Sequence, residues 1–231
     1  MKIEILFPEI ANLYGDIYNV EYLKASISEV DIINTSLQDT PYFCNHEIDM
    51  LYIGPMPDDY LPLAVSSLEK HKHELVKLIE NDTLVLATGN SLELFGTHFG
   101  QSEKSTKGLG IFPYYSILNY NNRLNTLFLG EFHNIEIVGF KSQFSLTYKN
   151  INPFIKVKRG SGINPKDDFE GVNYHNFFGT YLLGPLLVLN PYFTKYLLAL
   201  LGYENKLAFE EEAINAYNQR CLEYQQVKSL I

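Results

Sequence analysis

The sequence contains no tryptophan, only two cysteines and no long hydrophobic run. Cys44 and Cys221 are too few for a disulfide framework and lack the close spacing of metal ligands, so we expect neither a disulfide nor a bound metal. The longest apolar stretch, Tyr181 to Leu189, is interrupted by a glycine and a proline and is far too short to cross a bilayer. Membrane insertion is therefore not expected.

Positive charge is also scarce. The chain has 18 lysines and arginines against 27 aspartates and glutamates, which gives a net charge of −9. Such a chain repels phosphate backbones, and no local basic patch is visible, so we expect no nucleic-acid partner. The first residues, Met1 to Pro8, include an acidic residue and no cleavage-site pattern, and therefore predict a strand rather than a signal peptide. We expect a cytoplasmic protein without a cofactor.

The length and composition are those of a globular protein. A chain of 231 residues can bury roughly 70% of its unfolded surface and needs no disulfide or zinc to hold its core. Apolar residues make up 46% and charged residues 19%, which excludes collagen-like, coiled-coil and disordered classes. No low-complexity linker or repeat divides the chain. We expect one domain over residues 1–231.

The N-terminal half alternates short apolar runs with segments of helical period. Helices are predicted at Asn19–Ser28, Asp58–Glu80 and Leu92–Phe99, and strands at Ile3–Phe7, Val30–Asn34, Asp49–Ile53 and Thr83–Ala87. Strands that alternate with helices indicate a parallel sheet of the α/β class.

The second half is richer in short, turn-separated strands. These are predicted at Lys107–Tyr115, Arg123–Glu131, Ile135–Lys141, Phe144–Tyr148, Phe154–Val157 and Val172–Tyr181, with helices at Pro191–Gly202 and Leu207–Val227. Together the halves predict an α/β fold: a single three-layer domain with a mixed, largely parallel sheet flanked by helices. Leu84 to Ala87 should lie in a central strand.

The turn after that strand carries the most chemical information. Ala87-Thr88-Gly89-Asn90-Ser91 leads from a buried strand into the predicted helix, which is the shape of a nucleophile elbow. The nucleophile position would be Gly89, which has no side chain but accepts the strained backbone of such a turn. Taken alone, this turn is also typical of a plain glycine turn in many α/β proteins.

Further landmarks extend the pattern over roughly residues 3–201. They are Leu6–Val20 with its Tyr-Gly-Asp-x-x-Asn motif, Asp49–Asp58, Leu84–Gly96, Gly108–Pro113, Ile137–Phe140, Glu170–Val172, Phe178–Leu187 and Asn190–Pro191. In order and spacing they resemble the CobB/CobQ-like class I glutamine amidotransferases, in particular the glutaminase subunits of lipid II isoglutaminyl synthase. The resemblance implies a flavodoxin-like fold. It also implies a subunit that feeds ammonia to a Mur-ligase-like partner, which amidates the peptidoglycan stem.

The departures from that family fall on its reactive positions. Its nucleophilic cysteine corresponds to Gly89 and its catalytic histidine to Leu183. Its oxyanion loop reads Gly54-Pro55-Met56-Pro57, its Glu-Asn-His segment reads Lys141-Ser142-Gln143, and its elbow glutamine is Glu93. Glutamine hydrolysis needs a thiolate, a base and donors for the oxyanion, and the two prolines have no N–H to donate.

We therefore interpret the chain as a degenerate, non-catalytic amidotransferase scaffold in which Gly89 and Leu183 are vestigial. It would act as a scaffold, a regulator or a small-ligand binder, with a Mur-ligase-like partner or through self-association. The residues expected to line the old glutamine pocket are Gly54, Met56, Asn90, Glu93 and Gln143.

Two alternatives remain to be weighed against the structure. An active enzyme could use Glu93, Ser91 or Cys44 instead, which requires a base close to a nucleophile in one pocket. The chain could also be an ordinary glutaminase whose alignment to the family is out of register. This alternative is disfavoured, because neither cysteine follows a buried strand with small residues after it. We expect Thr88 and Ser91 to cap the elbow helix, His98 to lie at its end, and Cys44 to be a half-buried structural thiol.

Overall fold

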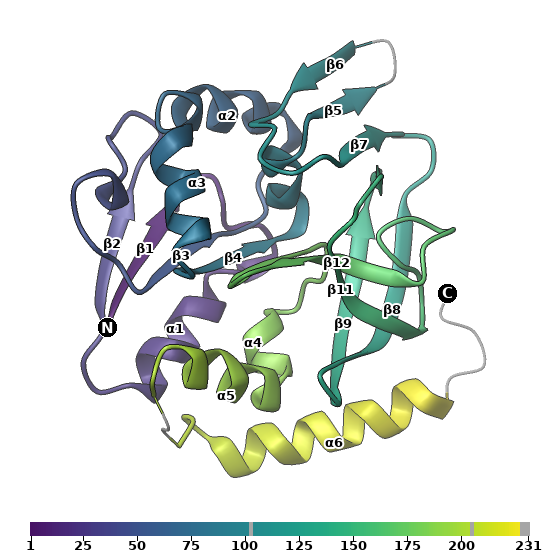
Figure 1. The fold of residues 1–231 in the computed structure, drawn as a ribbon. Coiled ribbons are helices and arrows are strands. Elements are labelled where there is room, and N and C mark those ends of the chain that lie inside the picture. Colours follow the sequence, from purple (N-terminus) through teal and green to yellow (C-terminus); the bar gives the residue numbers. More distant parts are fainter. Residues whose placement is uncertain (102–103, 204–205, 227–231) are drawn as a thin grey trace.

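The computed structural model describes residues 1–101, 104–203 and 206–226, and Figure 1 shows their arrangement. The strands are β1 (Lys2–Leu6), β2 (Asp31–Thr35), β3 (Met50–Ile53), β4 (Leu84–Thr88), β5 (His98–Gln101), β6 (Lys104–Lys107), β7 (Tyr115–Leu118), β8 (Leu124–Phe132), β9 (Ile135–Gln143), β10 (Ser145–Tyr148), β11 (Pro153–Arg159), β12 (Phe169–Tyr174) and β13 (Phe177–Thr180). The α-helices are α1 (Tyr18–Ser26), α2 (Leu61–Glu69), α3 (Lys72–Glu80), α4 (Leu186–Leu189), α5 (Pro191–Leu200) and α6 (Glu210–Gln226). Short 3₁₀ helices are η1 (Leu13–Gly15), η2 (Tyr42–Cys44), η3 (Asp58–Tyr60) and η4 (Gly89–Phe95).

A nine-stranded sheet organises the molecule in the order β2-β1-β3-β4-β13-β12-β11-β8-β9. Pairs from β2 to β13 are parallel, whereas pairs from β13 to β9 are antiparallel. The prediction of an α/β fold with a mixed sheet flanked by helices is confirmed, although parallel pairing is confined to one half of that sheet. The predicted central position of Leu84–Ala87 is confirmed as well, because β4 has neighbours on both sides.

Both faces of the parallel half are buried, which explains why its strands are continuous apolar runs. Val85 and Ala87 of β4 pack into a core with α2 and α3, while Leu84 and Leu86 pack into a second core with α1, α4 and α5. Successive side chains of a strand point to opposite faces, so one strand serves both cores. Figure 1 shows these two groups of helices on opposite sides of the sheet.

The C-terminal half adds two elements around the antiparallel strands. A four-stranded sheet in the order β10-β7-β5-β6 stands beside the carboxyl ends of the parallel strands (Figure 1). Helix α6 lies along β8 and β9, where the Tyr217 hydroxyl donates to the Glu136 carbonyl over 2.9 Å. None of the helices in the described ranges is long and apolar enough to cross a membrane.

Several element predictions need correction. The helix expected over Asp58–Glu80 is divided into η3, α2 and α3. The strand expected over Val172–Tyr181 is a hairpin of β12 and β13, because the chain turns at His175, where φ is +51°. The prediction of a strand over Lys107–Tyr115 is wrong for the residues between its two ends. Lys107 is the last residue of β6, and Tyr115 is the first residue of β7. The last residue of the helix expected over Leu207–Val227 lies outside the described residues.

The helix predicted over Leu92–Phe99 is also wrong. The chain makes the 3₁₀ segment η4 and then enters β5, because carbonyls near the end of η4 accept hydrogen bonds from the segment before β7. Leu109 N–H donates to Leu94 O over 2.8 Å, and Ile111 N–H donates to Phe95 O over 2.9 Å. His98 therefore opens a strand and stacks on Tyr115, rather than standing at a helix C-terminus.

Candidate functional site

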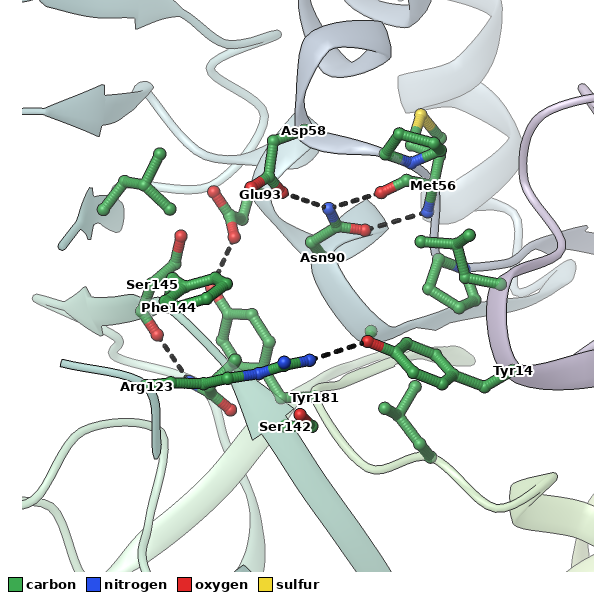
Figure 2. Close-up of a pocket in the computed structure, with 17 residues that line it drawn as sticks. Tyr14, Met56, Asp58, Asn90, Glu93, Arg123, Ser142, Phe144, Ser145 and Tyr181 are labelled. Carbon is green, nitrogen blue, oxygen red and sulfur yellow. Dashed lines mark hydrogen bonds between the residues drawn. The ribbon is translucent and has the colours of Figure 1, made fainter. Parts of the chain in front are cut away.

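A cavity of about 150 Å³ opens where β3 and β4 end, at the edge of a parallel sheet where α/β proteins commonly bind ligands. Its walls come from η1, the loop after β3, η4, the residues around the end of β9 and the segment after β13. Figure 2 shows side chains from these elements turned toward one another around the opening. The sheet therefore gathers segments that are far apart in the sequence.

Gly89 forms the floor of this cavity beside β4. Its φ of +61° lies in the left-handed region, which glycine adopts without a steric penalty. A Cβ built on Gly89 would lie 2.5 Å from Pro55 Cβ and 3.3 Å from Leu183 Cδ2. The space that a side chain at position 89 would need is thus occupied by Pro55.

Leu183 is fixed on the other side of Gly89 by main-chain pairing. Its N–H donates to Phe140 O over 2.8 Å, and Phe140 N–H donates to Leu183 O over 3.2 Å. This isolated bridge joins the segment after β13 to β9. The buried leucine side chain contributes an apolar surface and no proton donor or acceptor.

Asn90 locks the loop after β3 against the elbow. Its Oδ1 accepts from Met56 N–H over 3.0 Å, and its Nδ2 donates to Met56 O over 2.7 Å and to Asp58 Oδ1 over 2.9 Å (Figure 2). Between Pro55 and Pro57 the single backbone N–H is that of Met56, since proline has none. The side chain of Asn90 therefore occupies the one donor that this stretch offers.

Glu93 is a buried carboxyl group that lines the cavity, with 2% of its surface exposed. The Tyr181 hydroxyl donates to its Oε1 over 3.2 Å and also contacts Thr147 Oγ1 at 2.8 Å. Desolvation raises the pKa of Glu93 to about 8, against the stabilising effect of hydrogen bonds from Ser145 and Tyr181. Near neutral pH a small change in its surroundings can therefore shift this group between its carboxylic acid and carboxylate forms.

Beneath Tyr181, a fully buried ion pair supports the wall of the cavity. Lys141 Nζ lies 2.5 Å from Glu170 Oε2 and donates to the carbonyl of Gly162 over 2.6 Å. Glu170 Oε1 accepts from Thr180 Oγ1 over 3.0 Å and from Tyr181 N–H over 2.8 Å. The pair thus fixes the backbone that leads to Tyr181 and the residues after it.

The mouth of the cavity carries an arginine and a buried amide. Arg123 Nη2 donates to the Tyr14 hydroxyl over 3.0 Å, and its guanidinium lies 5.0 Å from the centre of the Phe144 ring (Figure 2). Gln143 has 7% of its surface exposed, and its Nε2 donates to Ser145 O. Gln143 Oε1 is buried and has no hydrogen-bond partner among the residues that the structure describes.

The Tyr-Gly-Asp-x-x-Asn motif builds a polar cluster behind the cavity. Asp16 accepts hydrogen bonds from the hydroxyls of Tyr52 and Thr88, and Asn19 Oδ1 accepts from Leu187 N–H over 2.8 Å. Burial raises the pKa of Asp16 to about 6. These contacts join the N-terminal segment to the ends of β3 and β4 and to α4. The motif therefore has a structural role in this chain.

Of the residues expected to bind a ligand, the structure brings Met56, Asn90, Glu93 and Gln143 to the cavity. Gly54 is not among its lining residues. Gly54 packs closely against the backbone of Ala11, whose carbonyl oxygen would lie 2.4 Å from a Cβ built on Gly54. Sequence reasoning did not single out Tyr14, Arg123, Ser145 or Tyr181 as site residues. Tyr181 and Tyr14 lie within the quoted landmarks, but nothing local marks the other two.

The other candidate groups lie elsewhere or are engaged. Thr88 and Ser91 do not cap η4: Thr88 bonds Asp16, and Ser91 Oγ donates to the carbonyls of Ile53 and Thr88. Cys44 is half-buried, as expected, and lines a separate groove near α3. Burial raises the pKa of its thiol to about 11, so it is a weak nucleophile.

Comparison with known proteins identifies relatives of this arrangement. Residues 2–190 match the CobB/CobQ-like glutamine amidotransferase domain. The chain is 29% identical to the lipid II isoglutaminyl synthase (glutamine-hydrolyzing) subunit GatD of Staphylococcus aureus, over 88% of this chain and 85% of that protein. It is 30% identical to the subunit of the same name from Streptococcus pneumoniae, over 82% of this chain and 76% of that protein.

Solved structures with the same fold include a glutamine amidotransferase with a TM-score of 0.58, 10% identity and coverage of 87% of this chain and 99% of that one. A glutamine amidotransferase from Thermotoga maritima gives a TM-score of 0.51 at 10% identity, covering 99% of both chains. These structures support the fold.

Proposed function

We propose that this chain, which belongs to the CobB/CobQ-like glutamine amidotransferase family, is a non-catalytic subunit of an amidating complex in the cytoplasm. In this role it does not hydrolyse glutamine. It acts as a scaffold or regulator for a Mur-ligase-like synthase subunit that modifies a cell-wall precursor. The name of the S. aureus and S. pneumoniae relatives, a subunit of lipid II isoglutaminyl synthase, supports the pathway and the presence of a partner subunit.

The observation that carries the proposal is the contact of Pro55 with the space beside Gly89. The elbow keeps the left-handed backbone of a nucleophile turn, yet Pro55 Cβ lies 2.5 Å from where a side chain would begin. Leu183 stands where the family resemblance places the base, and Met56 N–H is bonded to Asn90. Each requirement of amide hydrolysis, a nucleophile, a base and an oxyanion donor, therefore lacks support at this position.

The alternative of a non-standard nucleophile finds less support. Neither a cysteine nor a histidine is among the described residues that line the cavity. Ser91 Oγ donates to two backbone carbonyls, and Cys44 lies in another groove. Glu93 is a carboxyl group of suitable pKa for a base, but its hydrogen-bonded partner is Tyr181, whose own pKa burial raises well above its ordinary value.

Two measurements on the full chain test the proposal. Ammonia release from glutamine is expected to equal that of buffer alone, both for the isolated chain and in the presence of the copurified partner. Affinity purification from the native host is expected to recover a Mur-ligase-like protein in stoichiometric amount. Turnover that survives the double change Cys44→Ala and Cys221→Ala would contradict the non-catalytic role and indicate another nucleophile. Turnover abolished by Cys44→Ala would place the active site in the groove near α3.

A further inference from the structure

We propose that strand β2 is a self-association edge, on which a second copy of this chain adds its own β2 in antiparallel orientation about a twofold axis at Ile33. This inference goes beyond the proposed function and does not rest on it. In the sheet, β1 and β3 separate β2 from β4 and the turn that follows β4.

The outer side of β2 is an open edge of the nine-stranded sheet. Figure 1 shows β2 at the margin, with β1 as its neighbour on one side. Asp31 N–H donates to Met1 O over 2.8 Å, and Thr35 O accepts from the residue after β1 over 2.7 Å. Alternate residues of a parallel strand bond to the same neighbour, so Ile32 and Asn34 turn their N–H and C=O away from β1. The described part of the chain offers these outward groups no hydrogen-bond partner.

The other margins of the two sheets are protected against pairing. At β9, Val138 N–H donates to Asn190 Oδ1 and Val138 O accepts from Asn190 Nδ2, each over 2.8 Å. At β10, Thr147 N–H donates to Ile163 O over 3.3 Å, and β6 has a lysine at each end. Covered backbone and edge lysines are the usual means by which proteins prevent edge-to-edge pairing. Strand β2 has no lysine, no proline and no bulge, so it is suited to accept another strand.

The outward groups of β2 are arranged symmetrically about its central residue. Ile32 and Asn34 flank Ile33 in a strand of five residues. In an antiparallel pair, residues that lie opposite each other alternate between hydrogen-bonded and non-hydrogen-bonded positions. A twofold axis at Ile33 sets Ile32 opposite Asn34 of the second copy, and each outward N–H then meets an outward C=O. The strand is therefore its own complement, which is what a twofold interface requires.

The side chains of β2 favour the same pairing. Ile33 is only half-buried, and the axis sets it opposite Ile33 of the second copy, where side chains of a non-hydrogen-bonded pair come closest. A β-branched pair in this position stabilises a sheet. Asp31 is exposed at the start of the strand and would lie opposite Thr35 of the second copy. The two aspartates then stand at opposite ends of the pair, so like charges do not face each other.

The first test is sedimentation equilibrium of the full chain from micromolar to millimolar concentration. A dimer is expected with a Kd on the order of 10–100 μM, because one added strand pair buries less surface than the interfaces of tight complexes. Hydrogen exchange followed by NMR identifies the edge. The amides of Ile32 and Asn34 should exchange more slowly as the concentration rises, whereas those of Asp31, Ile33 and Thr35 bond to β1 and should be protected at every concentration.

Two variants of β2 separate this edge from other surfaces. Asn34→Pro removes an outward N–H and no hydrogen bond within the chain, and should raise the Kd of the dimer at least tenfold. Asn34→Ala is the matched control: it removes the exposed side chain, keeps the N–H and should associate like wild type. Ile33→Lys sets like charges opposite each other across the axis and should also weaken the dimer, which keeps the test informative if the proline variant folds poorly.

Three results would overturn the inference. Wild type could remain monomeric up to millimolar concentration. A dimer could form with the same Kd in Asn34→Pro and Ile33→Lys, which would place the interface on another surface. A different copurified protein could bind to wild type and be lost in Asn34→Pro while wild type alone stays monomeric, which would assign the edge to a foreign strand. Ammonia release from glutamine, measured on the same samples, tests the proposed function separately.

Discussion

The Cβ of Pro55 lies 2.5 Å from the point where a Cβ on Gly89 would stand, closer than real Cβ contacts come. The loop after β3 therefore packs against the turn after β4 with the Pro55 ring directly against Gly89. Asn90 holds this fit in place through its hydrogen bonds to Met56. Any side chain added at position 89 must first displace the Pro55 ring.

This fit predicts an unusually costly glycine substitution. Gly89→Ala should lower the free energy of unfolding by roughly 2–5 kcal/mol, because left-handed strain and overpacking add. Gly202→Ala is the matched control: Gly202 also has a positive φ of +77°, but nothing lies within 4 Å of its added Cβ. It should lose only about 1–2 kcal/mol. Urea unfolding of both variants measures the difference, and equal losses would show that the contact with Pro55 is not rigid.

Restoring the family's reactive residues should not restore activity. Gly89→Cys and Leu183→His are each expected to release ammonia from glutamine no faster than buffer, because one member of a catalytic pair supplies little of the rate. The double variant should recover a trace at most, since Met56 N–H is bonded to Asn90. Adding Pro55→Gly to the double variant removes the Cβ that blocks position 89. Robust turnover by either single variant would contradict the proposed loss of the oxyanion donor.

The sequence predicted the parallel half of the sheet well, because β3 and β4 are buried on both faces and read as uninterrupted apolar runs. It failed where distant backbone decides the local conformation. Leu92 to Phe99 has a helical pattern, yet Leu109 and Ile111 take the carbonyls that a helix would have used. A local pattern holds no information about such long-range hydrogen bonds.

The site shows the same division. Gly89, Asn90 and Glu93 follow the strand directly and were predictable from their place after it. Ser145 and Arg123 reach the cavity from β10 of the four-stranded sheet and from the residue before β8, which are far from β4 in the sequence. Thr88 was expected to cap a helix by its position, but the carboxylate of Asp16, 72 residues away in the chain, captures its hydroxyl.

Asn90 should be essential for the shape of the loop after β3. Asn90→Ala removes three hydrogen bonds and is expected to cost about 1–3 kcal/mol. Asn90→Asp should cost more despite its matching size, because an oxygen would replace Nδ2 in front of Met56 O and the Asp58 carboxylate. Lowering the pH protonates the new carboxyl group and should reduce the difference in the free energy of unfolding between Asn90→Asp and Asn90→Ala. Urea unfolding at pH 7 and pH 4.5 measures both effects, and an Asp variant as stable as wild type would contradict them.

The buried pair of Lys141 and Glu170 should behave as a coupled unit. Lys141→Met strands a buried carboxylate and is expected to cost roughly 3–5 kcal/mol. Adding Glu170→Gln should recover a large part of this loss, because the amide oxygen still accepts from Thr180 and Tyr181 while its NH₂ can donate to the carbonyl of Gly162. A double-mutant cycle by urea unfolding gives the coupling free energy. Strictly additive losses would mean that the two side chains act independently.

Glu93 should make the protein less stable as the pH rises. Its pKa is about 8 in the folded protein against an ordinary value of 4.5, so folding favours the protonated form. The stabilisation is complete below pH 4.5, is lost progressively as the pH rises from 4.5 to 8, and is gone above pH 8, a total of about 4–5 kcal/mol. Asp16, with a pKa of about 6, acts in the same direction at lower pH, so the range from pH 6.5 to 9 isolates Glu93.

Glu93→Gln cannot ionise and should remove most of this dependence, which makes the variant more stable than wild type at pH 9. Glu69→Gln, at an exposed carboxylate, should keep the slope of wild type. Urea unfolding of the three proteins at pH 6.5, 7.5 and 9 measures the slopes. If wild type and Glu93→Gln lose stability in parallel, the carboxyl group is solvated and ionised throughout the range.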